Sequence, residues 1–495
     1  MGVAALWFFE GLRLLLRLLV LVLSAHFLRA AFTGISKREP AAPPVPDQWP
    51  CVTVQLPMRN EFYVVERAIS AACELDYPIE LLEVQVLDDS EDATRGRAAE
   101  VVERFARRGI DVKLLHRAVP TGYKAGALNA GLASARGELI AIFDADCVPP
   151  RDFLRRMVPW FSERDLGCVQ ARWSFLNRNR SVLTRVQALV LDGLFAVDQF
   201  SRTGSRLPLQ FNGTNGVWRR AAIDESGGWD ASTLAEDAEL SFRAQLIGWR
   251  VQIVRSYAVP TEIPVDMPAF RAQQRRWAMG SAQILRSLGM RILRAPVPWR
   301  AKLLMFMHLG RHSIDPLILF ACVTAPLTNL YGMRYLVDYG VRVNVALVVL
   351  VNVACLLFYG VAVRQVGESG LSILFVPLVV PLAMGMSLLY TVAFAQGLFQ
   401  RGGRFVRTPK VGDRGEPDGP TYASPVDPLA FVELGFAAAH AYFTYRVLAR
   451  GDWPYAAFFL AVTGSFAWVG LGSLLGSRRR PSRGGRLDSG ADAMR

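Results

Sequence analysis

The chain has 495 residues, 52% of them hydrophobic, and a formal net charge of +13. This length exceeds that of one small domain. Such a positive charge can indicate a nucleic-acid partner, but the basic residues are concentrated beside apolar runs, as at Arg286, Arg291 and Arg294. That arrangement is typical of the cytoplasmic side of a membrane protein and argues against a nucleic-acid partner. The six cysteines form no C-x-x-C pair, which argues against a zinc site and a disulfide framework.

An apolar stretch comes first along the chain. Residues 7–33 are interrupted by Glu10, Arg13 and Arg17, and no clear small-residue cleavage site follows them. They therefore predict a retained, tilted membrane helix rather than a signal peptide. The Pro-rich residues 34–50 predict a linker, and we assign residues 1–47 to this helix and linker.

Alternating strand and helix patterns follow. Strands are predicted over 51–58, 81–90, 112–117 and 138–146, and helices over 61–75 and 91–109. The alternation predicts an α/β domain, at residues 48–285, with a parallel sheet covered by helices on both faces. In such sheets ligands bind beyond the carboxyl ends of the strands. Asp88 and Asp89 end one predicted strand, and Asp144 and Asp146 end another.

Long apolar segments occupy the rest of the chain. They lie at 314–332, 343–364, 371–398, 428–449 and 453–476, and a membrane-spanning helix needs about 20 residues. We assign interface helices and membrane segments to 286–398, a polar loop to 399–427, two membrane helices to 428–476 and a disordered basic tail to 477–495.

The first candidate site is the D-x-D sequence of Asp144 and Asp146, two carboxylates that repel each other unless a cation lies between them. Carboxylate oxygens suit Mg²⁺ or Mn²⁺, which proteins often share with substrate phosphates. The alternative is a solvated turn with two acidic residues. The aspartates at 88 and 89 can accept a hydrogen bond from a nucleobase N–H, and Lys124, in "GYKAGALNAGL", suits phosphate charge.

These motifs, together with "AED" (235–237) and "QQRRW" (273–277), resemble the processive, membrane-embedded family 2 glycosyltransferases of the cellulose synthase superfamily. That family has an aspartate pair, D-x-D, [T/S]ED and Q-x-x-R-W in this order. The blocks at 122–132, 169–199 and 211–230 are most similar to plant cellulose-synthase-like mannan synthases and their bacterial relatives. Ala235 is a departure, since the family usually has Thr or Ser there.

The resemblance implies a GT-A-type (Rossmann-like) glycosyltransferase domain with an α-helical transmembrane domain. It makes Asp237, beside Glu236, the general base on an acceptor hydroxyl, with inversion at the anomeric carbon. It also implies that Trp277 stacks on an acceptor sugar; the alternative is a tryptophan at the membrane interface. The remaining residues implied to bind substrate are Asp88, Asp89, Lys124, Asp144, Gln273, Arg275 and Arg276, and those implied to bind metal are Asp144 and Asp146.

A further resemblance concerns "FVRTPK" (405–410), which matches the gating loop of cellulose synthases at Phe405, Thr408 and Lys410. In that family the loop closes over the nucleotide sugar, and closure excludes competing water. The loop must then lie on the same side as the transferase domain, although three apolar segments separate them. We therefore expect 371–398, whose first half contains Pro377 and Pro381, to lie in the interface or to re-enter the membrane.

The resulting topology has five crossings, with the N-terminus outside and Arg478–Arg480 inside. We expect an integral protein of a bacterial inner (plasma) membrane with a cytoplasmic transferase domain that extends a β-linked polysaccharide and translocates it. The expected donor is UDP-glucose or GDP-mannose, and the expected acceptor is the growing glycan. Membrane lipid is a further expected partner, and this function leaves room for accessory export subunits. The alternatives are a glycolipid-forming transferase, such as a ceramide glucosyltransferase, and a non-catalytic transporter or scaffold.

Other polar and aromatic residues are expected to have structural roles. His308 and His312 are spaced as a metal pair but have no third ligand nearby in the sequence. Asp192 and Asp198 are expected to lie on a helix surface or to be structural. Trp229 suits either an acceptor contact or the core.

Overall fold

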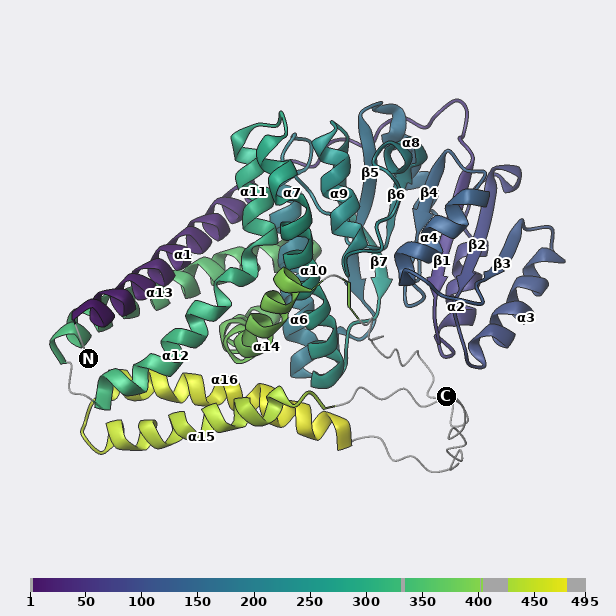
Figure 1. Cartoon of the computed structure of the whole chain (residues 1–495). Coiled ribbons are helices and arrows are strands. Elements are labelled where there is room, and N and C mark those ends of the chain that lie inside the picture. The colour runs from purple at the N-terminus through teal and green to yellow at the C-terminus, as the bar shows by residue number, and fades with distance from the viewer. Residues whose placement is uncertain (1–2, 331–333, 401, 404–425, 479–495) are drawn as a thin grey trace.

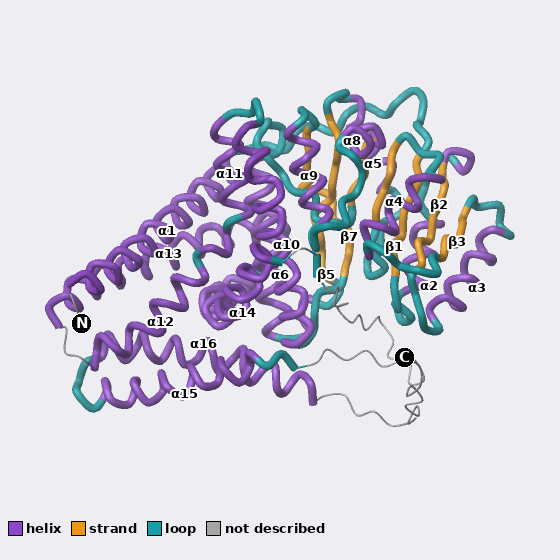
Figure 2. The backbone as a smooth tube through the Cα atoms, viewed as in Figure 1, coloured by secondary structure: helices purple, strands orange, loops and turns teal. Residues whose placement is uncertain are grey.

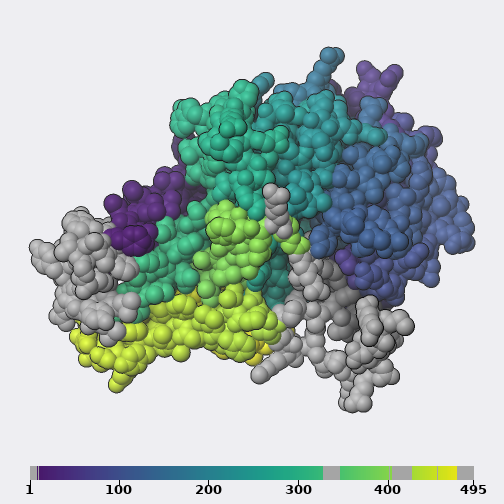
Figure 3. Space-filling view, viewed as in Figure 1, coloured from purple at the N-terminus to yellow at the C-terminus, as the bar shows by residue number. Residues whose placement is uncertain are grey.

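The computed structural model describes residues 3–330, 334–400, 402–403 and 426–478. A mixed α/β domain stands on the right of Figure 1, and long helices extend from it to the left. The space-filling view shows the same arrangement, with the N-terminal and C-terminal helices reaching away from the sheet domain (Figure 3). The predicted loop residues Phe405, Thr408 and Lys410 lie outside the described residues.

The sheet domain contains a single seven-stranded sheet in the order β3-β2-β1-β4-β6-β5-β7 (Figure 2). The four predicted strands are present as β1, β2, β3 and β4. The strands are β1 (Val52–Met58), β2 (Leu82–Asp88), β3 (Val112–His116), β4 (Leu139–Ile142), β5 (Leu166–Phe175), β6 (Gly216–Arg219) and β7 (Arg250–Thr261).

The sheet is mixed rather than parallel, because β6 runs antiparallel to both β4 and β5. Between β5 and β6 the chain leaves the sheet, forms helices beside the membrane segments and returns at the edge where β5 ended. A strand that re-enters at that edge must run in the opposite direction. The alternating sequence pattern that predicts parallel strands stops after β4, so this reversal was not visible in it.

Helices cover both faces of the sheet, as predicted. One core lies between the sheet and α2, α3 and α5, and a second lies between the sheet and α4, α8 and α9. The helices of this domain are α2 (Val65–Cys73), α3 (Thr94–Ala106), α4 (Tyr123–Ser134), α5 (Phe153–Met157), α6 (Val182–Asp192), α7 (Phe200–Arg202), α8 (Arg220–Glu225) and α9 (Glu236–Leu246), with a π-helical segment at Gly193–Gln199.

Beyond β7 the chain is helical. The predicted domain boundary at 285 falls inside the continuous helix α10. The helices are α10 (Met267–Arg294), α11 (Trp299–Leu309), α12 (Asp315–Leu330), α13 (Arg334–Val366), α14 (Val379–Phe399), α15 (Leu429–Leu448) and α16 (Trp453–Arg478), and the N-terminal helix is α1 (Val3–Ser36). Helix α1 packs along α13, where Phe27 stacks on Phe358 with ring centroids 4.6 Å apart.

Four segments among the described residues are long and apolar enough to cross a membrane. They are Glu10–Ser36, Ala346–Val366, Gly370–Phe399 and Tyr455–Gly476. This is the composition of an integral membrane protein. The predicted segments 314–332 and 428–449 form α12 and α15, which are not among these four.

The segment predicted not to span has a distinct structure. A 3₁₀ helix at Gly370–Leu378, which contains Pro377, precedes the α-helix α14. In Figure 1, α14 is seen end-on while α1, α13, α15 and α16 are seen from the side, so α14 lies across them. Length and composition alone would still let this segment cross a membrane, and its position in the interface stays a prediction.

Candidate active site

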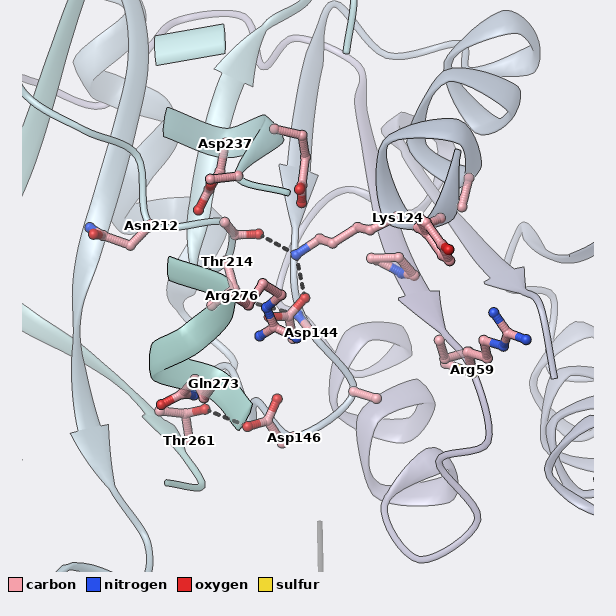
Figure 4. A pocket seen from close by; sticks show the side chains of 18 of the residues that line it. Arg59, Lys124, Asp144, Asp146, Asn212, Thr214, Asp237, Thr261, Gln273 and Arg276 are labelled. Atoms are coloured by element: carbon pink, nitrogen blue, oxygen red, sulfur yellow. Dashed lines mark hydrogen bonds and ion pairs between the residues drawn. The ribbon is translucent and has the colours of Figure 1, made fainter. Parts of the chain in front are cut away.

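A cavity lies at the edge of the sheet where β1, β2, β4 and β7 end and β6 begins (Figure 4). Its walls come from loops that follow those strands, from the first turn of α9 and from α10. The predicted site residues that line it are Asp89, Lys124, Asp144, Asp146, Glu236, Asp237, Gln273, Arg276 and Trp277.

The centre of the cavity holds a lysine–carboxylate pair. Lys124, in the first turn of α4, donates to Asp144 Oδ1 at 2.5 Å and to the backbone oxygen of Gly213 at 2.8 Å. Burial opposes the positive charge, but the carboxylates of Asp144 and Glu236 outweigh it and raise the pKa of Lys124. The ammonium therefore stays charged among the acidic groups and is suited to an incoming phosphate.

Asp146 is more enclosed than its neighbour in the D-x-D motif. It is 6% exposed and accepts a hydrogen bond from the Thr261 hydroxyl at 3.1 Å, whereas 38% of the Asp144 side chain is exposed. The backbone N–H of Asp144 donates to Thr214 Oγ1 at 2.8 Å. A residue at the end of β7 and one in the loop before β6 thus hold the segment with the two aspartates, which follows β4.

Asp237 stands in the first turn of α9, opposite the loop that contains Gly213 (Figure 4). Gly213 has φ +82°, and a Cβ there would lie 2.9 Å from Asp237 Oδ2, so a residue without a side chain is required for this approach. Burial, followed by the charge of Glu236, raises the pKa of Asp237 to about 7. A carboxylate with such a pKa is well matched to proton abstraction near neutral pH.

Because Ala235 has no side-chain acceptor, the N-terminus of α9 lacks a side-chain cap. Ala235 occupies the N-cap and makes no side-chain cap hydrogen bond, while the N–H of Ala238 donates to Asp237 Oδ1 at 2.8 Å. A Ser or Thr at the N-cap usually accepts from the amide two or three positions into the helix. In this chain Asp237 satisfies that amide itself.

Neighbouring arginines of α10 have different surroundings. Arg276 lies beside Asp144 in the cavity (Figure 4). Arg275, which the sequence assigned to diphosphate, is not among the residues that line the cavity: it donates to Asp427 at 3.2 Å and to Gln396 at 2.9 Å. It therefore links α10 to α14 and to the segment that precedes α15.

The two acids after β2 are also in different positions. Asp88 is fully buried, contacts His116 Nδ1 at 3.0 Å and is not part of the cavity wall. Asp89 lines the cavity and receives two hydrogen bonds from Arg117, at 2.8 and 2.5 Å. Asp89, rather than Asp88, is placed to face a ligand.

A second cavity adjoins the first between α9, α10 and α11. The two share Trp173, Asn212, Ala235, Asp237 and Trp277. Away from Asp237 the second cavity combines apolar walls with a few polar side chains. These are Gln210, Ser281, His308 and Arg311. Trp277 therefore stands between two cavities that meet at Asp237.

Comparison with known proteins gives the family. The family model described as glycosyl transferase family group 2 matches residues 139–388, just over half of the chain, and that of glycosyl transferase family 2 matches 53–221. The chain belongs to the family 2 glycosyltransferases. The predicted family and GT-A-type fold are confirmed.

Curated relatives of this glycosyltransferase include plant proteins. Glucomannan 4-beta-mannosyltransferase 2 of Arabidopsis thaliana is 43% identical over 50% of the chain, and glucomannan 4-beta-mannosyltransferase 7 of the same plant is 34% identical over 74%. The matches span 47% and 66% of those two proteins. Being plant proteins, they give no support to the expected bacterial membrane.

A solved structure has the same fold. It is a mannosyltransferase from Pyrobaculum calidifontis in complex with GDP-Man and Mn²⁺, which aligns with a TM-score of 0.53 at 20% identity. The alignment covers 79% of the glycosyltransferase described here and 99% of the archaeal chain.

Several residues of the glycosyltransferase are structural. Asp192 accepts from Arg178 at 2.7 Å, and Asp198 pairs with Arg202 and with His26 of α1. Trp229 is 4% exposed in the core beneath α4 and α9.

The two histidines have separate polar partners. His308 contacts Gln210, whereas His312 contacts Asp315 at 3.0 Å. No cluster of three or more potential metal ligands occurs in the described part of the chain.

Sequence reasoning missed some residues of the site. Thr214 and Thr261 contact the D-x-D segment, and Trp173 and Asn212 line both cavities. Three of them, Thr214, Trp173 and Asn212, belong to sequence blocks that resemble the family. Nothing in the local sequence indicates which residues of those blocks face a ligand. Thr261 carries no sequence signal, because its partner Asp146 is 115 residues away.

Proposed function

We propose that this protein is a membrane-bound inverting glycosyltransferase that transfers mannose from GDP-mannose to a growing β-linked polysaccharide and translocates the product. The names of the plant relatives support mannose as the sugar. The observation that carries the proposal is the convergence of Asp237, Lys124 and the D-x-D pair on one cavity.

The D-x-D pair fits a divalent cation that is shared with a substrate. Asp144 and Asp146 offer hard carboxylate oxygens, and Mg²⁺ is commonly held by one or two carboxylates together with substrate phosphates. Mn²⁺ suits the same donor set. Such a cation supplies Lewis-acid stabilisation for the departing nucleoside diphosphate.

The chain's own side chains provide the remaining chemistry. Lys124 and Arg276 contribute positive charge for the diphosphate, and the planar Arg276 guanidinium suits bidentate phosphate contact. Asp237 accepts the proton of the acceptor hydroxyl as that oxygen attacks the anomeric carbon from the face opposite the diphosphate. An α-linked donor then becomes a β-linked product.

The second cavity is the proposed position of the acceptor. It begins at Asp237, where the attacking hydroxyl must lie, and continues toward α11. Trp277 lies at the junction, and the face of an indole ring is suited to the C–H face of a sugar. The cavity reaches Arg311, just before α12.

The ends of the polar loop support the proposed topology. The Gly402 N–H donates to the Ser232 backbone oxygen at 3.2 Å, and Asp427 pairs with Arg275. Both described ends of segment 404–425 therefore contact the transferase domain or α10. We propose that α1, α12, α13, α15 and α16 cross the membrane and that α14 does not. Impermeant labelling of a cysteine at Ser424 from outside intact cells would refute this topology.

A donor and product assay tests the proposed function. The full-length protein in nanodiscs is given labelled GDP-mannose or UDP-glucose with Mn²⁺, with Asp237→Asn as the inactive control. A β-linked mannan formed from GDP-mannose supports the proposal. A glucan formed from UDP-glucose would correct the donor, a labelled glycolipid would favour the ceramide glucosyltransferase alternative, and no product from either donor would overturn the proposal.

A further inference from the structure

A buried cysteine lies directly behind the D-x-D motif. Cys147 is 1% exposed, and its Sγ lies 3.2 Å from Thr214 Oγ1 and 3.5 Å from Thr261 Oγ1. These two hydroxyl groups are the ones that contact the motif, since Thr214 accepts from the Asp144 N–H and Thr261 donates to Asp146 Oδ2. The thiol therefore connects the two ends of the D-x-D segment.

The chemistry of the groups fixes the direction of the hydrogen bonds. An ionised carboxylate only accepts, so the single hydroxyl proton of Thr261 points to Asp146. Thr261 must then accept from the Cys147 S–H, whose only proton is thereby used. The Thr214 hydroxyl is left to donate, either to Cys147 Sγ or to Asn215 Oδ1 at 3.3 Å, while it accepts from the Asp144 N–H. Each of the three side-chain donors, Thr214, Cys147 and Thr261, therefore has an acceptor.

We propose that Thr214, Cys147 and Thr261 form a hydrogen-bonded relay that positions the Asp146 carboxylate for a divalent cation. The inference rests on the proposed cation at the D-x-D motif. The three members act through Asp146 and are positioning residues. They come from the loop before β6, the segment after β4 and the end of β7, so the relay fixes three separate parts of the sheet edge relative to one another.

Two properties suit a thiol to this position. A thiol has one proton to donate and lone pairs that accept, so it can link the two threonine hydroxyl groups at 3.2 and 3.5 Å. Sulfur is also larger than oxygen and spans the distance between the two threonines. A serine retains the donor and acceptor, whereas an alanine removes both.

The test measures Mn²⁺ binding directly. Free Mn²⁺ is followed by electron paramagnetic resonance while the purified full chain is titrated in the presence of GDP, and the melting temperature of each variant is recorded. Thr261→Val removes the hydroxyl with little change in shape, and Thr261→Ser retains it. Cys147→Ala and Cys147→Ser form the second pair. Cys73→Ala, which removes the buried thiol at the end of α2, is the matched control.

We expect Thr261→Val to weaken Mn²⁺ binding by about 10–100-fold, the usual effect of losing a group that orients a metal ligand. Cys147→Ala is expected to weaken it less, because one bond to Asp146 remains. Thr261→Ser and Cys73→Ala are expected to stay close to the wild type. Cys147→Ser keeps the donor and the acceptor on a smaller atom and is expected to lie between Cys147→Ala and the wild type. If Thr261→Val does not fold, the alanine–serine comparison at Cys147 still decides the question.

The outcomes separate this inference from the proposed function. Equal Mn²⁺ affinity in the wild type, Thr261→Val and Cys147→Ala would overturn the relay and leave the cation site intact. A wild-type protein that binds no Mn²⁺ with GDP would overturn both. A fall in affinity that is matched by Cys73→Ala would show a general effect of lost packing and would also overturn the relay.

Discussion

Replacement of Asp237 by Asn tests the assignment of the general base. The amide retains the size of the side chain and can still accept from the Ala238 N–H, but it cannot take a proton. Loss of a general base lowers rates by about 10²–10⁴, which is about 3–5 kcal/mol of barrier. Donor binding, measured by nucleotide competition, is expected to change little because Asp144, Asp146 and Lys124 remain.

The pKa of Asp237 adds a pH signature to this test. Since burial and Glu236 raise that pKa to about 7, the wild-type rate should rise with pH and level off above about 7. One unit below the pKa only about one tenth of the sites are ionised. Initial rates from labelled donor should therefore fall about fivefold between pH 7 and 6 and about tenfold for each further unit, and this acid limb should be absent in the Asn variant.

Stability provides the control for folding. A carboxyl whose folded pKa is raised from 3.8 destabilises the protein at high pH, and this cost is relieved as the pH falls through the folded pKa toward 3.8. Asp237→Asn removes the cost, so its melting temperature above pH 7 should equal or exceed that of the wild type. Near-normal turnover in the variant, or an acid limb that persists, would refute the assignment.

Three further substitutions test the geometry around Asp237 and the D-x-D motif. Ala235→Ser should cap α9 by accepting from the Ala238 N–H, and the acid limb of the rate should move to higher pH because Asp237 loses that hydrogen bond. Gly213→Ala places a side chain at φ +82° and 2.9 Å from Asp237 Oδ2, so both the rate and the melting temperature should fall, the backbone strain alone costing about 1–2 kcal/mol. Asp146→Ala should weaken nucleotide binding in Mg²⁺ or Mn²⁺, and unchanged binding that is independent of metal would contradict the cation site.

Local sequence patterns determined the architecture of the first half of the domain. Apolar strand segments that alternate with helical segments predicted β1 to β4, and the positions of Asp89 and Asp144 at strand ends predicted that they would meet at one edge, because parallel strands all end there. The order of the acidic and Q-x-x-R-W motifs indicated the family. These features depend on short-range periodicity and on residue types, which a single sequence displays directly.

Only the tertiary structure decided which side chains of each motif face the cavity. Arg275 and Arg276 are adjacent in the sequence, but consecutive residues of a helix point about 100° apart, so one reaches Asp144 while the other binds Asp427 and Gln396. The contact of Thr261 with Asp146 and the reversal of β6 likewise depend on how distant segments pack. A sequence records residue types and their spacing, whereas the direction of a side chain is set by the packing of the whole element that carries it.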